Sequence, residues 1–412
     1  MSRTLVCSLV LLFALSACKK KPAPPAGTVQ APPTAPTATA GTGEKPATPA
    51  ATPAATPTAG CVLAAKVSAD VTITRGCTVP VKESVTVDDG ASLTIEPGAK
   101  LLFEPDTYLW ITKGKLVARG TAEAPITFTS AAKTPAASDW IGFFFDENAS
   151  AGNVLDHAVV EYAGKASSGG AGGITIRGGA AGRISITNST IRKNEQSGVT
   201  NANDKTTFAK FEGNTLAENG GTSLKLRANV LGSIGAGNKL GDPVHVEGNV
   251  TVSQAWPALD VPIVVDGVVG VGGEKSAAIL TLAEKTTLKF TTGQYLWVGT
   301  EQGGGLVAKG VTFTSANTPA TAGDWIGIFL DAKTTGTVLD GCTIEYAGRA
   351  ESGGGGAITF RGLKADGAKI SGAVMKNNKQ AGFAGLEGDC GDLVKPESSN
   401  KSEGAPICPK PE

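Results

Sequence analysis

Apolar and polar residues alternate in many short segments of this chain. The pattern is clear in Leu93–Glu96, Ile126–Thr129, Ile174–Arg177 and Ile184–Thr187. A period of two is typical of a β-strand with one buried face. No long run places apolar residues at the 3.6-residue spacing of a helix. The pattern therefore predicts an all-β fold of short strands separated by turns.

A short repeat underlies this alternation. Residues 190–199 (TIRKNEQSGV) align with residues 215–224 (TLAENGGTSL), which places Asn194 on Asn219, 25 residues later. A propeller blade needs about 40 residues, whereas a period of about 25 suits one coil of a parallel β-helix. We expect coils stacked about 4.8 Å apart. Asparagine tolerates left-handed backbone, and its side chain can join neighbouring coils in a hydrogen-bonded ladder.

The chain also contains a long duplication. Residues 114–199 share an ordered series of motifs with residues 304–383, including SDWIGFFFD with GDWIGIFLD and VLDHAVVEYAG with VLDGCTIEYAG. Trp140 corresponds to Trp325 at an offset of 185 residues. We therefore predict a parallel β-helix solenoid made of two duplicated units and a C-terminal cap. The predicted ranges are residues 61–245, 246–389 and 390–412.

The first 60 residues have features of an exported, lipid-anchored protein. Residues 1–17 contain a basic residue and a short apolar run, the pattern of a secretory signal peptide. The sequence Leu-Ser-Ala-Cys that ends at Cys18 is similar to a bacterial lipobox. We expect Cys18 to carry the lipid, because two or three acyl chains anchor a protein stably. The alternative is an ordinary signal peptide with a chance cysteine.

The segment after Cys18 is expected to be a stalk. Residues 18–60 consist mostly of Pro, Ala, Thr and Gly, which cannot build a core. Lys19 follows Cys18 where an inner-membrane lipoprotein would have Asp. By resemblance to enterobacterial sorting, this favours the outer membrane or cell surface.

The composition narrows the classes of function. The chain has 37 Lys and Arg, 37 Asp and Glu, two His and 55 Gly among 412 residues. Proteins that bind nucleic acid carry a basic stripe, so we expect no nucleic-acid partner. The sequence contains no zinc-ligand spacing, P-loop or nucleophile elbow. We expect no metal or cofactor, and a monomer.

Five cysteines remain once Cys7 is assigned to the signal peptide and Cys18 to the lipid. A solenoid must cover its terminal coils, and a disulfide-closed loop at each end would do so. The predicted disulfides are Cys61–Cys77 and Cys390–Cys408. Cys342 takes the place of Ala158 of the first copy, and we expect it to be a small buried residue.

Several of these motifs carry a family resemblance. LTIEPGAKLLF, GKLVARGTAEAPITFTS, DWIG, EYAG and ISITNSTIRKN resemble segments of the right-handed parallel β-helix proteins of bacterial surfaces, within the pectate-lyase-like superfold. The resemblance covers most of residues 67–383. It implies the fold rather than the function, because this superfold carries lyases, hydrolases and adhesins.

The two DWIG segments supply candidate ligand-binding residues. The apolar series 141, 143, 145 and 326, 328, 330 fits a core-facing side, which would turn the alternate aromatic residues outward. These are Trp140, Phe144, Trp325 and Phe329. Aromatic residues also alternate with leucine in Tyr108–Trp110 and Tyr295–Trp297. Outward aromatic rings on a flat β-surface can stack on sugars or partner proteins.

In an alternative interpretation, these aromatic residues are buried. The Gly-rich insertions at residues 164–173 and 348–357 would fold over them and form a second small core. In that case the rings contribute to stability and do not contact a ligand.

Charged residues in the same regions are further candidates. Glu161 and Arg177 are expected to face outward, as are Glu345 and Arg361 in the second copy. They are candidate ligand-binding residues. The alternative is a cross-strand ion pair in each copy, worth up to ~1 kcal/mol if exposed.

An enzymatic function would need further groups. Asp139, Asp156, His157 and Glu161 could supply carboxylates and a base, but Gly341 replaces His157 in the second copy. By family resemblance, lyases need calcium-binding carboxylates beside an Arg or Lys base, and polygalacturonase-like hydrolases need several Asp near a Gly-His-Gly segment. Neither constellation is recognised here, so we assign no catalytic residue.

The sequence as a whole predicts a stalked parallel β-helix lipoprotein that binds or scaffolds without catalysis. The expected partner is a polysaccharide or an envelope protein, besides the membrane that holds the lipid. Two alternatives remain, a polysaccharide lyase or glycoside hydrolase of the same superfold and a purely structural spacer.

Overall fold

The computed structural model describes most of the chain after residue 57. The described ranges are residues 58–166, 172–179, 182–350, 355–362, 368–386 and 400–402. The predicted signal peptide, Cys18, Cys390, Cys408 and residues 18–57 of the predicted stalk lie outside these ranges. No helix in the described part of the chain is long and apolar enough to cross a membrane.

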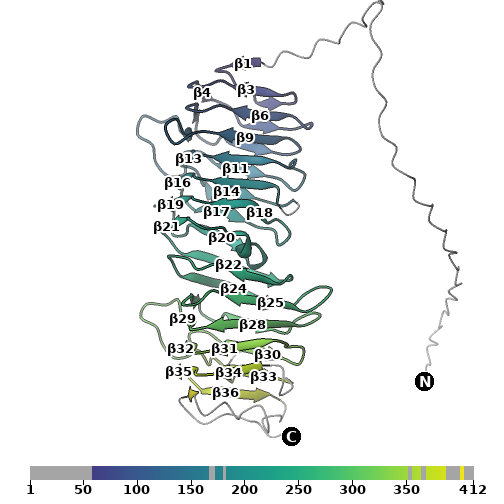
Figure 1. Cartoon of the computed structure of the whole chain (residues 1–412). Helices are drawn as coiled ribbons and strands as arrows, with labels where there is room; N and C mark the ends of the chain where they lie inside the picture. Colours follow the sequence, from purple (N-terminus) through teal and green to yellow (C-terminus); the bar gives the residue numbers. More distant parts are fainter. Residues whose placement is uncertain are drawn as a thin grey trace, which may run out of the picture. The chain divides into compact units, whose positions relative to one another are not determined.

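The described residues form a stack of short parallel strands (Figure 1). Sheet A contains β1 (Thr58–Gly60), β3 (Val71–Ile73), β6 (Ser92–Ile95), β9 (Lys115–Arg119), β12 (Asn153–Asp156), β15 (Ile184–Thr187) and β18 (Phe208–Glu212). Sheet C contains β4 (Thr78–Val81), β7 (Lys100–Phe103), β10 (Ile126–Ser130), β13 (Ala158–Glu161), β16 (Thr190–Arg192), β19 (Thr215–Ala217) and β21 (Lys239–Leu240). Sheet D contains β23 (Gln254–Trp256), β25 (Ala278–Leu282), β28 (Gly304–Lys309), β31 (Thr337–Asp340) and β34 (Ala368–Ser371).

Sheet B runs through both sequence copies. Its strands up to the middle of the chain are β2 (Lys66–Val67), β5 (Val85–Val87), β8 (Tyr108–Ile111), β11 (Gly142–Phe145), β14 (Gly172–Ile176), β17 (Ser197–Asn201), β20 (Leu224–Arg227), β22 (Val244–Val250) and β24 (Ile263–Val271). Its later strands are β26 (Thr287–Phe290), β27 (Tyr295–Val298), β29 (Thr312–Ser315), β30 (Gly327–Asp331), β32 (Thr343–Glu345), β33 (Gly356–Arg361), β35 (Val374–Lys376), β36 (Ala381–Leu386) and β37 (Lys401–Ser402).

The strands pair in the way that a β-helix requires. Strand β10 lies between β7 and β13, and β11 lies between β8 and β14, with parallel pairing throughout. Each coil therefore places its strands on the corresponding strands of the previous coil. The predicted all-β, right-handed parallel β-helix is confirmed.

The core is built from columns of like residues. The register places Leu109, Phe143, Ile174, Val199 and Leu224 on successive strands of sheet B. All five are completely buried. Burial of such a side chain contributes about 1.5–3 kcal/mol, so the apolar half of the two-residue alternation holds the coils together.

The predicted asparagine ladder is present at the 25-residue spacing. The side-chain amide of Asn194 donates to Oδ1 of Asn219 at 2.9 Å, and the amide of Asn219 donates to the Ile191 carbonyl at 3.1 Å. The left-handed residues are the ones before them, Lys193 and Glu218, with φ of 56° and 58°. The asparagine side chains thus satisfy backbone groups at a turn that their predecessors make.

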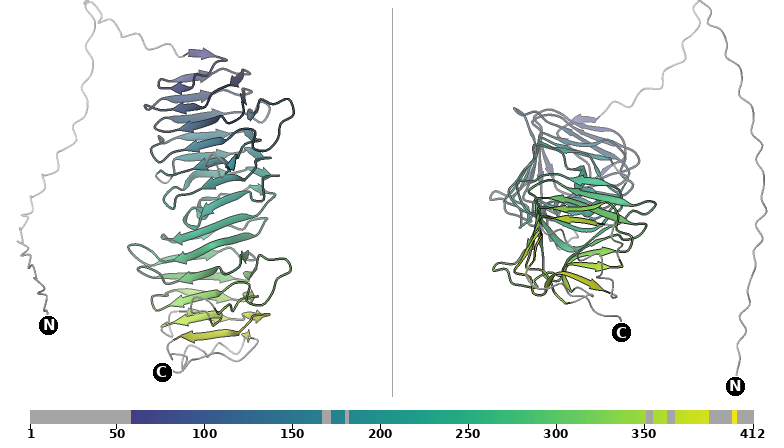
Figure 2. Two further views of the ribbon diagram at one scale, coloured as in Figure 1. Left: turned by 180° about the vertical axis from the view of Figure 1, so that it is seen from behind. Right: turned by 60° about the horizontal axis from the view of Figure 1, so that its bottom comes forward.

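The two sequence copies belong to one continuous solenoid (Figure 2). Sheet A ends at β18 and sheet C ends at β21. A 3-10 helix, η2 (Ala228–Ser233), follows β20, and sheet D begins at β23. Strand β24 pairs with β26 through Ile263–Val265 and with β27 through Val269–Val271. Because one buried apolar cluster contains core residues from both copies, the solenoid is not interrupted between them.

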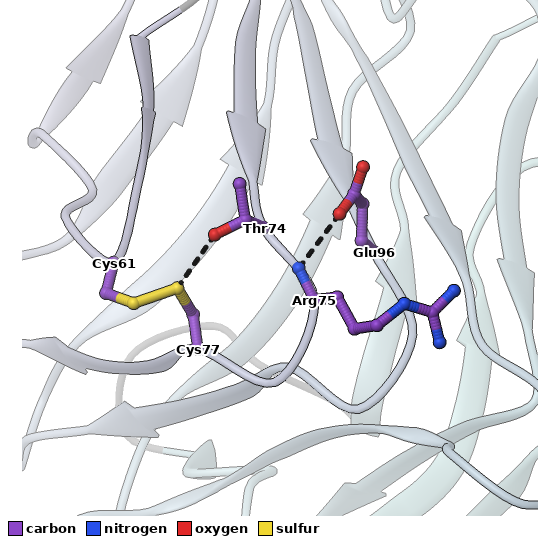
Figure 3. The surroundings of a disulfide bond; sticks show 5 residues. All are labelled: Cys61, Thr74, Arg75, Cys77 and Glu96. Atoms are coloured by element: carbon purple, nitrogen blue, oxygen red, sulfur yellow. Dashed lines mark hydrogen bonds between the residues drawn. A yellow bond between two sulfur atoms is a disulfide. The ribbon is translucent and has the colours of Figure 1, made fainter.

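A disulfide lies at the N-terminal end of the solenoid (Figure 3). Cys61 is bonded to Cys77, as predicted, and closes the segment that precedes β4. The backbone N–H of Arg75 in the same loop donates to a carboxylate oxygen of Glu96 at 2.9 Å. A closed loop of this length stabilises a fold by about 3 kcal/mol.

Candidate functional site

Trp140 and Trp325 lie in the core, so the expectation that they face outward is wrong. Both are 0% exposed. Trp140 stacks on Phe103 with the ring centroids 4.0 Å apart, and its Nε1 donates to the Glu161 carbonyl at 2.9 Å. Trp325 stacks in the same way on Phe290, also at 4.0 Å. These two tryptophans pack the interior and are not available to a ligand.

A glycine explains why the alternation failed at this point. Gly142 has φ of 123° and Gly327 has φ of 138°, a conformation that side chains rarely adopt. A Cβ atom on Gly142 would lie 2.8 Å from the Gly173 carbonyl oxygen. The backbone turns at each glycine, so Trp140 and Phe143 can both point inward although they are three residues apart.

The Gly-rich insertions are only partly within the described residues. Residues 167–171 and 351–354 lie outside them. Lys165, at the start of the first insertion, forms an ion pair with Asp106. The burial of Trp140 and Trp325 comes from the main core.

An aromatic cluster lies on the outer face of sheet B in the first copy. We call Trp110, Phe144, Asp146 and Arg177, with neighbouring Tyr108, aromatic set 1. Trp110 and Phe144 face each other across β8 and β11. The guanidinium carbon of Arg177 lies 4.1 Å from the Phe144 ring centroid and 5.7 Å from that of Trp110. Nε1 of Trp110 donates to Asp146 at 3.2 Å, which fixes the indole against the sheet.

The exposure of these rings differs. Phe144 points away from the core, as expected, but is only 3% exposed, with Tyr108 and Arg177 against it. Trp110 is half-buried and Arg177 is exposed. The surface that a ligand can reach is therefore formed by Trp110, Tyr108 and Arg177.

The second copy has the same arrangement. We call Trp297, Phe329, Asp331 and Arg361, with neighbouring Tyr295, aromatic set 2. Nε1 of Trp297 donates to Asp331 at 2.7 Å, and the guanidinium carbon of Arg361 lies 5.4 Å and 5.0 Å from the ring centroids of Trp297 and Phe329. In this copy Arg361 also forms an ion pair with Asp331 at 3.4 Å. Trp297 is half-buried, whereas Phe329 is 1% exposed.

The two candidate glutamates, Glu161 and Glu345, each lie on a different face of the solenoid from the candidate arginine of the same copy. Glu161 pairs with Arg192 at 2.9 Å and Glu345 pairs with Lys376 at 3.4 Å. The alternative of a Glu161–Arg177 ion pair is therefore wrong. Glu161 ends β13 in sheet C, whereas Arg177 follows β14 in sheet B, because the chain turns a corner between these strands.

The candidate acids of the enzymatic alternative are dispersed. Asp139 accepts hydrogen bonds from the Ser130 hydroxyl at 2.6 Å and from a backbone N–H of its own loop. Burial opposes ionisation of Asp156, but hydrogen bonds from Asn188 and Thr187 outweigh it and lower the pKa of this carboxyl. Asp139 precedes β11 and Asp156 ends β12, which belong to different sheets.

His157 has a conformational role. The φ angle of His157 is 49°, and that of Gly341 at the corresponding position of the second copy is 62°. The Nδ1 atom of His157 lies 3.2 Å from the Asp156 carboxylate. Both residues make the same left-handed turn, which explains why glycine can replace histidine in the second copy. Within the described ranges, no group of three or more His, Cys, Asp or Glu could hold a metal ion.

Cys342 is buried and is not disulfide-bonded. Burial raises the pKa of its thiol, and Sγ lies 3.4 Å from the Ala308 carbonyl oxygen. The prediction of a small buried residue is confirmed.

A pocket of about 470 Å³ adjoins aromatic set 2. Trp297, Asp331 and Arg361 form one side of it, and the loop that contains Thr300 and Glu301 forms another. Pockets for small ligands typically measure about 300–1,000 Å³. This pocket therefore has room for a small polar ligand beside the indole ring.

Comparison with known proteins agrees with this architecture. Residues 65–175 match the model of a family described as the pectate-lyase like beta helix domain. Together with the stacked parallel sheets, this match fits a right-handed parallel β-helix. No curated protein and no solved structure matches the chain significantly.

Proposed function

We propose that this protein is a membrane-anchored β-helix that binds polysaccharide of the cell envelope through aromatic sets 1 and 2. The recurrence of an outward, half-buried tryptophan with the same aspartate and arginine partners in both copies carries the proposal. Core packing does not require this arrangement, because the rings project from the opposite side of the strands to the core.

The geometry suits sugar recognition. The apolar face of a pyranose stacks on an aromatic ring, while its hydroxyl groups need hydrogen-bonding partners nearby. Each indole is held by its aspartate before any ligand arrives, so little side-chain entropy is lost on binding. The adjacent arginine, whose guanidinium carbon lies over the indole at 5.7 Å in set 1 and 5.4 Å in set 2, supplies further hydrogen-bond donors.

Removal of the two half-buried indoles is expected to weaken glycan binding. Trp110→Ala and Trp297→Ala should each lower the affinity for a bound envelope polysaccharide roughly tenfold, and the double variant should lose detectable binding. Glycan arrays followed by titration calorimetry measure this. Glu83→Ala, at an exposed position, is the matched control. Unchanged binding by the double variant would refute the proposal and favour a structural spacer.

The family match gives a specific reason to test the enzymatic alternative. Incubation with uronate-containing glycans distinguishes binding from cleavage, since a lyase creates unsaturated ends and a hydrolase creates reducing ends. We expect neither product. Turnover that disappears in Glu161→Gln would favour the enzyme instead.

The N-terminal sequence supports anchoring of this module by lipid on Cys18, in the outer membrane or at the cell surface. Cys18→Ser is expected to abolish incorporation of labelled fatty acid and to release the protein from the membrane fraction, because the acyl chains would be lost. Fractionation with immunoblotting reads this out. Continued membrane retention without label would mean that another segment anchors the chain.

A further inference from the structure

Aromatic sets 1 and 2 lie on different walls of the solenoid, where a wall is a column of strands that pair from coil to coil. The wall of set 1 runs from β8 through β11, β14, β17, β20 and β22 to Ile263–Val265 of β24. It continues through β26, β29, β32 and β35. Set 2 belongs instead to the wall of β27, β30 and β33, in which β27 pairs with Val269–Val271 of β24.

The second copy is turned by one wall about the axis of the solenoid. Phe290 of β26 stacks on Trp325 as Phe103 of β7 stacks on Trp140, so β26 is the counterpart of β7. Strand β7 belongs to sheet C, yet β26 lies on the wall that carries set 1. The duplication therefore repeats the aromatic sets but changes the direction in which they face.

A corner separates the two walls at the level of set 2. Residues 291–294 join β26 to β27, and the backbone turns at Gly293, with φ of 75°. Residues 104–107 make the same turn between β7 and β8, with φ of 63° at Asp106. In both turns the N–H of the last residue donates to the carbonyl of the first, at 3.1 and 3.3 Å. Because β7 and β8 belong to different sheets, β26 and β27 also face different ways.

An extended polysaccharide chain that follows the wall of set 1 does not reach set 2. Beyond Trp110 and Phe144, the register places a series of residues on the same side of this wall. They are Thr175, Thr200, Lys225, His245, Val264 and Lys289. Lys289 lies in the coil that carries Trp297, so at that level the chain meets a lysine and not an indole. The path from β8 to β27 through β11, β14, β17, β20, β22 and β24 takes seven steps of about 4.8 Å, roughly 34 Å along the axis.

We infer that one molecule binds two separate polysaccharide chains, one on each wall, and so cross-links them. This inference rests on the proposed function and specifies how its two sets are used. The sets offer the same groups, an indole held by an aspartate beside an arginine, so both suit the same polysaccharide. One chain would have to bend around the corner within roughly 34 Å to bind both sets, and a linker that cannot span two sites gives no gain in affinity.

Co-precipitation of two labelled forms of one polysaccharide tests the cross-linking. The lipidated protein is reconstituted at one molecule per lipid nanodisc, so that the lipid does not join several copies. Biotin-labelled and fluorescein-labelled forms of dextran, mannan or polygalacturonate are mixed with it, and the biotin is captured on streptavidin. The unsubstituted protein should bring fluorescein down with a polysaccharide that binds. Trp110→Ala and Trp297→Ala should each reduce the fluorescein to the level without protein. Lys289→Ala, on the wall of set 1 at the level of set 2, should not.

Titration calorimetry with short oligosaccharides of the same sugar gives the number of sites. We expect about two per molecule, and about one in each single tryptophan variant, where binding through the other set also shows that the variant is folded. If the affinity instead rises roughly hundredfold once the oligosaccharide can span both sets, without co-precipitation, one chain binds both sets. The proposed function then stands and the inference is wrong. Co-precipitation that persists in either tryptophan variant also contradicts the inference. If none of these polysaccharides binds, both fail.

Discussion

Replacing Trp325 with alanine is expected to lower the free energy of unfolding by about 3–5 kcal/mol. The indole is completely buried, stacks on Phe290 and donates to the Glu345 carbonyl at 2.8 Å. Alanine would leave a cavity between coils and remove the donor to that carbonyl. Because an interior packs as densely as an organic crystal, the neighbouring coils can fill such a cavity only partly.

Trp297→Ala is the matched control for this prediction. It removes the same kind of side chain, but from the outer face of β27, where the ring is half-buried. We expect a clearly smaller loss of stability and a larger loss of glycan binding. Urea unfolding followed by circular dichroism measures the first effect. Equal destabilisation by both variants would contradict the assignment of Trp325 to the core and of Trp297 to the surface.

Replacing Asn219 with alanine is expected to destabilise the solenoid by about 2–4 kcal/mol. The side chain is 8% exposed. Its Oδ1 accepts from the backbone N–H and the side-chain amide of Asn194, and its amide donates to Ile191. Alanine would leave buried donors and an acceptor unpaired at the same turn, and each unpaired group costs more than the net value of its hydrogen bond.

Asn148→Ala provides the comparison, because Asn148 is exposed. We expect this substitution to change the free energy of unfolding by less than about 0.5 kcal/mol. Hydrogen exchange would then locate the loss in Asn219→Ala, with amides of β16 and β19 exchanging faster. If the free energy of unfolding were the same in Asn219→Ala and Asn148→Ala, the asparagine ladder would not contribute to stability.

The sequence was a strong guide to the fold because each coil repeats the same physical problem. Alternation identified strands such as Ile184–Thr187, and the spacing between Asn194 and Asn219 identified the coil. Both properties are local or periodic, so they can be read without knowing the structure. The orientation of Trp140 could not be read in this way, since Gly142 breaks the two-residue period just after it.

The binding surface was harder to predict because it joins residues from different coils. The two-residue alternation placed Trp110 on the opposite face of its strand from Leu109, and Trp297 on the opposite face from Leu296. Their aspartate partners, however, lie 36 and 34 residues away along the chain. The coils differ in length, so no fixed spacing reveals these pairs. An aspartate closing the FFFD and IFLD motifs of the two copies was the available signal, and its meaning depends on the register between strands.

Collisional quenching of tryptophan fluorescence tests the central claim most directly. The chain has five tryptophans, and only two of them, Trp110 and Trp297, are half-buried rather than fully buried. Acrylamide should therefore quench a fraction of the emission, and a saturating bound glycan should protect that fraction. The Trp110→Phe, Trp297→Phe double variant should lack it. A glycan that binds by calorimetry without changing the quenching would show that binding occurs elsewhere on the molecule.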